Sequence, residues 1–392
     1  MDMSNPLQVQ PDMVTHAISE SALIGRFQWP SHDPRLREQP SRPACASDDA
    51  RLASAATPDF DLEGFLKRTQ QLSGEMKIIE LLNECCQFNS RSRFRGNEDV
   101  QERIRRMQEA RRPIEIVLPA FAPVLNTVKR FDAMALSGAE DVSLLHLSWI
   151  ADLIGRVYEP GAVIHVVSDG VFYSSALGIT WVEAHMYEQR LIARVRELGI
   201  RNVVVHSMSE FLVPSHTEFL RNFDRHYQAI WKGHPEDGIS AKDAGRLAGS
   251  LLAGVNTRKY GLTYEEMRNL FSADVPAEQR YTKWVEIFVG VRDSATHYRA
   301  LRAALAELRW DEKRFPGAVR ATIHLKKLPV LGMRLYPEYR RRSMLLPYHG
   351  IGVLSHDGSF TVEPEMFVCG RAEYTRVVAA DGTTRFYEQT VS

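Results

Sequence analysis

The stretch IEIVLPAF at residues 114–121 decides the fold class of this 392-residue chain. It is an apolar run closed by proline, which is typical of a buried strand. Two more apolar runs follow it, AVIHVVS at 162–168 and NVVVH at 202–206. Helical spacing of apolar residues fills the gaps between them, at 143–158 and 182–198. This alternation of strand and helix predicts an α/β fold with a doubly wound, Rossmann-like parallel sheet.

Helical sequence flanks this core on both sides. Helical patterns at 60–89 and 91–112 precede it, and mostly helical sequence follows at 218–308. Residues 1–59 show no sustained period and become rich in Pro, Ser, Ala and Asp, which predicts a weakly structured tail or, alternatively, a lid or interface arm. The expected parts are an N-terminal extension at 1–59, a Rossmann-like core with a helical insertion at 60–310, and a β-rich part at 311–392.

The C-terminal part has the pattern of β structure. Asp357-Gly358 and Asp381-Gly382 lie between runs of β-forming residues, which indicates hairpins. No G-x-G-x-x-G motif follows the first strand of the core, so a dinucleotide is not indicated and we expect no cofactor. The strand candidates are 318–325, 351–355, 360–362 and 371–378.

Composition and charge narrow the class of protein. Lys plus Arg and Asp plus Glu each number 49, so the net charge of zero gives no attraction to nucleic acid or to an anionic membrane. The four cysteines form no C-x-x-C pair, which argues against a structural zinc site and fits a reducing compartment, the cytoplasm. No signal-peptide pattern opens the sequence, and no apolar run is long enough to cross a bilayer. We therefore expect a cytoplasmic protein.

Polar side chains follow the predicted parallel strands at the edge where open α/β sheets bind ligands. Ser168 and Asp169 end the second strand, and the acid either holds an amine or hydroxyl and exchanges protons, or caps an Asx-turn. Lys129 and Arg130 follow the first strand and either bind phosphate or carboxylate, or remain solvated charges. His206 ends the third strand, as a general base or as a buried structural histidine.

The C-terminal third carries a local excess of positive charge. Nine Lys/Arg against three acids between residues 311 and 344 give 9 − 3 = +6. Arg320, His324 and Lys326 alternate along one predicted strand and therefore share a face. Such a face either binds a phosphorylated or carboxylated ligand, or lies in solvent. His349 adds a titratable group in a turn before the next strand.

Taken together, these segments resemble the pyoverdine/dityrosine biosynthesis proteins. The N-terminal part of the resemblance rests on LPAF with a lysine in the following loop, on VVSDG, and on the helix opened by GITWVEAHMYEQRL. VRATIHL, LYP and LLPYHGIGVL are similar to the C-terminal signatures of the family, in which a histidine follows an aromatic residue, as His349 does here. The resemblance spans about residues 65–357. The loop before Lys129 lacks the Ser/Asn-rich stretch usual in the family.

The resemblance implies an isonitrile synthase, which converts the amine of tyrosine or tryptophan into an isonitrile with carbon from C2 of ribulose 5-phosphate. It implies no metal or nucleotide in the synthase, and a non-haem iron, 2-oxoglutarate-dependent oxygenase as the next enzyme of the pathway. The amine must lose a proton and the phosphate must be held, which calls for a base and for cations. The candidate catalytic residues are Asp169, His206, His324 and His349, and the candidate substrate-binding residues are Lys129, Arg130, Ser168, Arg320 and Lys326.

Three alternatives stay open. A lysine that first forms a Schiff base with the sugar is a second chemical route, and the sequence does not favour it. The yeast branch of the family makes an N-formyl product from tyrosine, and sequence features separate this outcome poorly from an isonitrile. A non-catalytic α/β protein that has kept the fold is the third, and it predicts that Asp169, His324 and His349 are dispensable.

Overall fold

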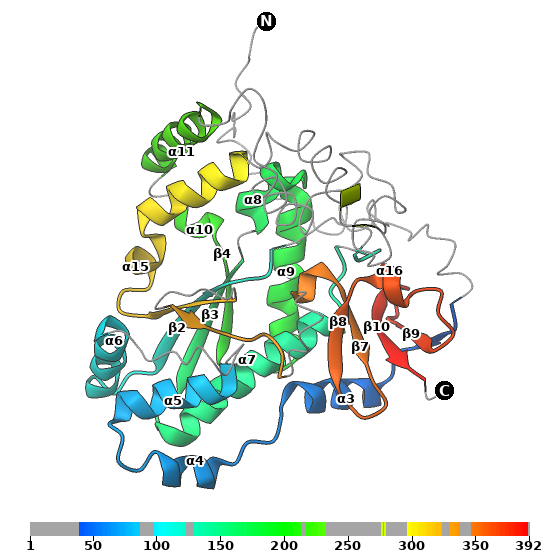
Figure 1. The fold of residues 1–392 in the computed structure, drawn as a ribbon, viewed down its shortest axis with the longest axis horizontal. Helices are drawn as coiled ribbons and strands as arrows, with labels where there is room; N and C mark the ends of the chain where they lie inside the picture. Colours follow the sequence, from blue (N-terminus) through cyan, green and yellow to red (C-terminus); the bar gives the residue numbers. More distant parts are fainter. Residues whose placement is uncertain are drawn as a thin grey trace, which may run out of the picture.

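The computed structural model describes residues 39–86, 98–122, 129–132, 134–168, 170–212, 216–232, 276, 278–279, 296–323, 330–337 and 346–390. Five of its strands form one sheet in the order β4-β3-β2-β5-β6, in which every neighbouring pair is parallel (Figure 1). This sheet confirms the predicted Rossmann-like α/β fold. The bounds are β2 (Ile114–Pro119), β3 (Ala162–Ser168), β4 (Val203–Ser207), β5 (Val319–Thr322) and β6 (Leu331–Gly332).

The order of these strands fixes where a ligand site belongs. The chain moves outward from β2 through β3 to β4, and then returns to the other side of β2 with β5 and β6. The winding therefore reverses between β2 and β5, and open α/β sheets bind ligands beyond the carboxyl ends of the strands at such a switch point. Because β2 ends at Pro119 and β5 at Thr322, the chain just beyond these two residues borders the switch point.

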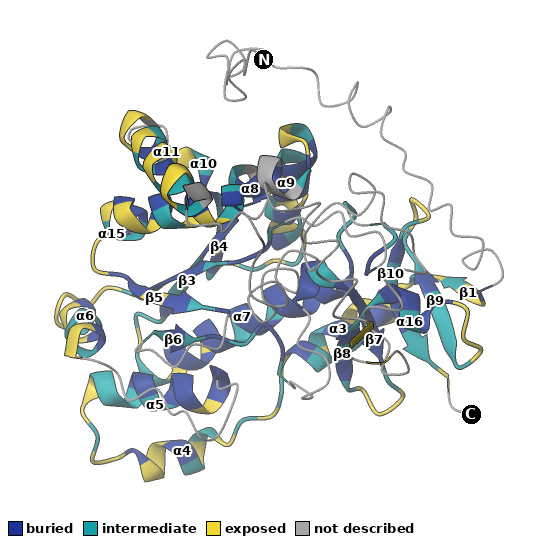
Figure 2. Ribbon diagram, turned by 45° about the horizontal axis from the view of Figure 1, so that its top comes forward, coloured by how far each residue is buried: buried dark blue, intermediate teal, exposed yellow. Residues whose placement is uncertain are grey.

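Helices cover both faces of the parallel sheet, since alternate strand residues point to opposite sides. Ile116 and Ile164 pack on one face with α5, α6, α7 and α9, whereas Val117 and Val167 pack on the other with α8, α10, α11, α15 and the helix at 296–308 (Figure 1). The outer sides of α6 and α11 are exposed, while the strands are largely buried (Figure 2). The bounds are α5 (Gly74–Cys86), α6 (Glu98–Glu109), α7 (Gly138–Val157), α8 (Gly170–Leu177), α9 (Trp181–Glu197), α10 (Ser209–Leu212), α11 (His216–Lys232) and α15 (Trp310–Arg314).

A second sheet of five strands packs against the far side of α7, in the order β1-β9-β10-β7-β8. Its two hairpins, β7–β8 and β9–β10, confirm the turns predicted at Asp357-Gly358 and Asp381-Gly382, because both glycines adopt positive φ. The bounds are β1 (Ser41–Pro43), β7 (Ile351–Leu354), β8 (Phe360–Glu363), β9 (Tyr374–Val378) and β10 (Thr384–Gln389), with the 3-10 helix η3 (Pro347–His349) before β7 and α16 (Glu365–Val368) after β8.

Helix α7 lies between the two sheets and is buried around most of its circumference (Figure 1). A capping box starts it: the Ser137 hydroxyl accepts from the Ala139 N–H at 3.1 Å, and the Glu140 carboxylate accepts from the Ser137 N–H at 2.9 Å. Because α7 runs back to the amino end of β3, its capped N-terminus lies at the carboxyl end of the parallel sheet. The buried carboxylate of Glu140 is thereby placed near the switch point.

The prediction of a weakly structured N-terminal extension is wrong for residues 41–56. This segment forms β1, which pairs in parallel with β9, and helix α3 (Ala46–Ala56). Leu52 is buried against the core, and Arg42 pairs with the buried Asp48 at 2.7 Å. Burial of apolar surface and this ion pair offset the entropy lost on ordering, which composition alone does not reveal.

The single helix expected at 60–89 is two helices within the described residues. Helix α4 (Leu62–Arg68) is capped by Asp61 and ends at Thr69, and a turn separates it from α5. The helix expected at 91–112 is present as α6. In the part of the chain that the structure describes, no helix has the length and apolar content needed to span a membrane.

A buried histidine makes the stability of the fold depend on pH. His146 of α7 is fully buried, its Nδ1 lies 2.9 Å from the carbonyl oxygen of Ala56, and its ring stacks on Trp149. Its Nε2 is buried with no hydrogen-bond partner among the described residues, so a proton there would be unsatisfied. Burial accordingly lowers the pKa of His146 to about 4.

We expect the free energy of unfolding to fall as the pH drops from about 6.5 to about 4, since the unfolded chain binds a proton that folded His146 does not. A shift of this size corresponds to about 3 kcal/mol. Urea unfolding at several pH values is the measurement, with the His146→Gln variant beside the wild type. The variant should show a flatter pH dependence in this range. Parallel curves for the two proteins would contradict the assignment.

Candidate active site

The carboxyl end of β2 has an unusual backbone conformation. Phe121 is buried and has φ of 66°, a left-handed conformation that is uncommon for a residue other than glycine. The hydroxyl of Ser168, at the end of β3, donates to the carbonyl oxygen of Phe121 at 2.9 Å. Ser168 is itself fully buried, so it fixes the backbone beside the switch point. The substrate contact that the sequence suggested for Ser168 stays a prediction.

The second sheet brings His349 to this edge. The ring of Phe121 lies 5.8 Å from that of Tyr348 in η3, and the Tyr348 ring packs edge-on against His349 at 4.7 Å. Pro347 opens the short helix, and the His349 N–H closes it by donating to the carbonyl oxygen of Leu346. His349 is half-buried, so it is held in place and still reaches solvent. These contacts link the end of β3 to η3, and the catalytic role of His349 stays a prediction from the sequence.

Arg130 is held in a buried polar network at the N-terminus of α7. Its guanidinium pairs with Glu140 at 2.5 Å and also donates to the carbonyl oxygen of Ala135. The Tyr187 hydroxyl donates to the same Glu140 carboxylate at 3.0 Å, and burial raises the pKa of Tyr187 well above its ordinary value. Arg130 is almost completely buried and pairs with Glu140, so it contributes to the packing at the start of α7; its predicted contact with substrate stays a prediction from the sequence.

Glu365 of α16 holds the same segment from the second sheet. Its N–H donates to the carbonyl oxygen of Lys129 at 2.7 Å, and its carboxylate accepts from the Phe131 N–H at 2.6 Å. The Tyr387 hydroxyl donates to the other carboxylate oxygen at 3.1 Å. Burial raises the pKa of Glu365 to about 7. The backbone around Lys129 is therefore fixed from the side of the second sheet, while α7 holds the neighbouring Arg130.

Lys129 is the other cation of this segment. It is only 5% exposed, and this burial lowers the pKa of its ammonium group to about 8. Two ion-paired arginines behave in the opposite way: for buried Arg130 desolvation is outweighed by the charge of Glu140 together with other neighbouring groups, so the pKa is raised, and for partly buried Arg194 the hydrogen bond to Asp141 raises it. Lys129 therefore carries a proton near neutral pH that it loses more readily than an ordinary lysine.

His206 lies on β4, the strand at one edge of the parallel sheet. It is the penultimate residue of β4, and its Nε2 is 3.1 Å from Nδ1 of His165 on β3. Its ring packs against Phe211 and Phe315, on the face of the sheet that carries α10 and α15. Burial lowers the pKa of His206 to about 4, and the neighbouring His165 adds to the effect. The structure places His206 among these aromatic rings and beside His165, and its role as a catalytic base stays a prediction from the sequence.

Arg320 lies on that same face. It pairs with Asp311 of α15 at 2.5 Å, and its guanidinium lies 5.1 Å from the centre of the Trp310 ring. It is exposed, and its register partner on β2 is Val117, in the middle of that strand. The expected contact of Arg320 with phosphate at the carboxyl end is therefore not supported. The reason is that its neighbours of opposite charge come from α15, which sequence spacing does not reveal.

Three of the predicted site residues lie outside the described residues: Asp169, His324 and Lys326. Asp169 directly follows Ser168 in the sequence, and His324 follows β5 by one residue. The chain positions next to them border the switch point. Their roles remain predictions from the sequence.

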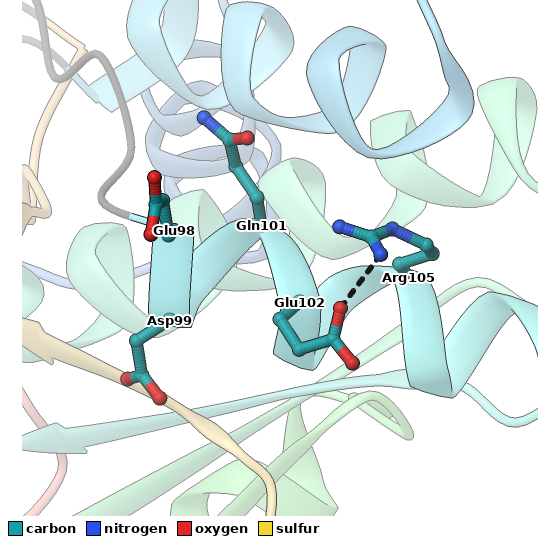
Figure 3. A pocket seen from close by; sticks show the side chains of 5 residues that line it. All are labelled: Glu98, Asp99, Gln101, Glu102 and Arg105. Carbon is teal, nitrogen blue, oxygen red and sulfur yellow. Dashed lines mark ion pairs between the residues drawn. The ribbon is translucent and has the colours of Figure 1, made fainter.

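Figure 3 shows a shallow hollow on the surface of α6, lined by Glu98, Asp99, Gln101, Glu102 and Arg105. All five side chains come from one helix, and Arg105 pairs with Glu102 at 2.7 Å. The hollow has no contribution from the strand ends that form the switch point. We regard it as the solvated face of an amphipathic helix.

Several residues of the site were missed by sequence reasoning. Glu140 had a signal, because Ser137-x-x-Glu140 is a capping-box pattern. Tyr348 lies in a motif that the family resemblance includes, but its contact with Phe121 depends on how the two sheets pack. Glu365 gives no local signal at all, since its importance arises from the segment that it holds.

The fold and the site define the class of this protein: a Rossmann-like α/β protein whose switch point is completed by a second, mixed sheet. The chain belongs to the pyoverdine/dityrosine biosynthesis protein family, whose model matches residues 104–371. The resemblance stated from the sequence is thereby confirmed.

Relatives within this family are isonitrile synthases. The chain is 29% identical to the L-tyrosine isonitrile synthase of Pseudomonas aeruginosa over 271 residues, which cover 67% of this chain and 77% of that protein. It is 31% identical to the L-tryptophan isonitrile synthase AmbI2 of Fischerella ambigua over 144 residues, 36% of this chain and 42% of the relative. The crystal structure of PvcA from Pseudomonas aeruginosa has the same fold, with a TM-score of 0.56 and 23% identity, and the match covers 81% of this chain and all of that one.

Proposed function

We propose that this chain is an isonitrile synthase that acts on the amino group of an aromatic L-amino acid, tyrosine or tryptophan, and takes the isonitrile carbon from C2 of ribulose 5-phosphate. The observation that carries the proposal is the family match over residues 104–371, which includes both Lys129 and His349. Relatives named as tyrosine and tryptophan isonitrile synthases support the class of substrate.

The geometry suits this chemistry. The amine must be deprotonated before it attacks the keto carbon, and half-buried His349 is the described histidine at the correct end of the sheet. Asp169, next to Ser168, is proposed to hold the ammonium group or a sugar hydroxyl. His324 and Lys326 are proposed to approach the same point from the end of β5, where a cation would hold the phosphate.

The product carries a reactive isonitrile and must be consumed by a further enzyme. As the family resemblance implies, we propose a non-haem iron, 2-oxoglutarate-dependent oxygenase as the enzyme that follows. No nucleic acid, membrane, metal or nucleotide enters the proposed reaction of the synthase itself, which we place in the cytoplasm.

The test is to incubate the purified protein with tyrosine or tryptophan and ribulose 5-phosphate, and to identify the product by infrared spectroscopy and mass spectrometry. An isonitrile stretching band with the matching mass is the expected result. An N-formyl amino acid as the first product would favour the yeast type of reaction instead. No consumption of either substrate would favour a non-catalytic binding protein.

A further inference from the structure

The segment around Lys129 is fixed more firmly than a surface lysine would need. Its own carbonyl oxygen accepts from Glu365, and the two following residues are held by Glu140 and Glu365. The next residue, Asp132, accepts from the Thr384 N–H at 3.2 Å. These contacts come from α7, α16 and β10, so α7 and the second sheet together position this one short segment near the capped N-terminus of α7.

A lysine held in this way differs chemically from a lysine that clamps phosphate. A phosphate clamp works best as a permanent cation, as the ion-paired arginines of this protein are. Lys129 is instead buried, and burial lowers the pKa of its ammonium group to about 8, so it loses its proton more readily than an ordinary lysine. Desolvation of an amine is a known way of making lysine a nucleophile toward carbonyl substrates.

We propose that Lys129 is the nucleophile that first captures the keto sugar as a Schiff base. This inference rests on the proposed function, because it takes ribulose 5-phosphate as the carbonyl substrate. The neutral amine of Lys129 forms a bond to C2, the carbonyl oxygen takes up two protons and leaves as water, and a protonated ketimine results. The deprotonated amine of the amino acid then adds to C2, and Lys129 leaves with its electron pair. Neither step needs an oxidant or a reductant.

Two routes lead to the same product: direct condensation of the amino acid with the ketone, and prior reaction of Lys129 with the ketone. The two routes differ in when the C2 oxygen is lost. If the amino acid condenses directly with the ketone, the enzyme accelerates exchange of the C2 oxygen with water, beyond the spontaneous rate in buffer, only when the amino acid is present. If Lys129 reacts first, the enzyme and the sugar phosphate alone are sufficient. Transimination also spares the amino acid from attacking an unactivated ketone, because a protonated imine is the better electrophile.

The experiment measures loss of a heavy oxygen isotope from the C2 carbonyl of ribulose 5-phosphate, with no amino acid added. The wild-type protein should exchange this oxygen at least as fast as it turns over, well above the rate in buffer. Borohydride added to the same mixture should trap a pentulose phosphate adduct on the peptide that contains Lys129. The Lys129→Arg and Lys129→Met variants should lose both signals, while Lys67→Arg, at an exposed lysine of α4, should keep them.

The outcomes are distinct. Isonitrile formation by a wild type that neither exchanges oxygen nor traps an adduct without amino acid would overturn the role of Lys129 and leave the proposed function standing. An adduct on a different lysine would overturn it as well. Failure to make an isonitrile from any aromatic amino acid would count against the proposed function, and the exchange measurement would still report on Lys129. Since exchange and trapping are read in the wild type, misfolding of a variant leaves the test decisive.

Discussion

Replacement of His349 by glutamine is expected to lower kcat by about 10²–10⁴-fold, the usual effect of removing a general base. Glutamine keeps a polar side chain of similar length but cannot accept and release a proton near neutral pH. The 3-10 helix that carries His349 is closed by backbone hydrogen bonds and by Pro347 and Tyr348, none of which the substitution alters. The loss should therefore appear in kcat and not in the melting temperature.

The matched control is His356→Gln. His356 lies in the β7–β8 turn, is exposed, and is only seven positions from His349. Its replacement should leave the rate within about twofold of the wild type, as expected for a surface substitution away from the site. A His349→Gln rate as high as that of the control, in a protein that melts normally, would remove His349 from the reaction.

A loss of activity is also expected on replacement of two residues that lie outside the described part of the chain. Asp169→Asn and His324→Ala should each abolish product formation while the protein stays folded. This prediction rests on the sequence, which places Asp169 after β3 and His324 after β5. If both variants kept activity within a few-fold of the wild type, neither residue would belong to the active site.

Replacement of Arg130 by methionine is expected to lower the free energy of unfolding by about 3–5 kcal/mol, because it leaves the Glu140 carboxylate buried without its cation. The size of this effect follows from burial, since the Arg130 and Glu140 side chains are 2% and 0% exposed. Urea unfolding monitored by fluorescence measures it. Adding Glu140→Gln to Arg130→Met should recover part of the loss, because a neutral amide needs no counter-charge: its oxygen can accept from Ser137, and its NH2 group can donate to the Tyr187 hydroxyl oxygen.

An exposed pair of the same type is the control. Arg106 pairs with Glu102 on the surface of α6 at 2.7 Å, and its side chain is 74% exposed. Arg106→Met should cost no more than about 0.5 kcal/mol, in line with exposed helical ion pairs. Equal losses for Arg106→Met and Arg130→Met would mean that the buried network does not hold the segment around Lys129.

The parallel sheet was predictable because its strands are continuous apolar runs, and the hairpins because Asp-Gly pairs mark their turns. The strand ends also indicated the edge of the sheet at which we propose the site. The contacts of individual side chains near that edge were not predictable. His206 is near the end of β4 but points to the face covered by α10, and Arg320 pairs with an acid from α15. Those neighbours come from distant parts of the chain, so sequence spacing cannot specify them.

The N-terminal segment also shows that sequence pattern alone does not reveal contacts between distant parts of the chain. Residues 41–56 have the composition of a disordered tail, yet β1 gains a partner in β9, and α3 packs on α7. The burial of Arg130, a candidate substrate-binding residue, was not predictable for a similar reason, because its partner Glu140 is ten positions away and is brought to it only by the start of α7. Order in both places comes from tertiary contacts and not from local propensity.

One measurement tests the central claim most directly: the fate of the C2 carbon of ribulose 5-phosphate. The purified protein is incubated with tyrosine or tryptophan and sugar phosphate labelled only at C2, and the product is examined by carbon NMR. The account predicts that the label appears in the isonitrile carbon. An isonitrile without label, or label only in unreacted sugar and its breakdown products, would contradict it.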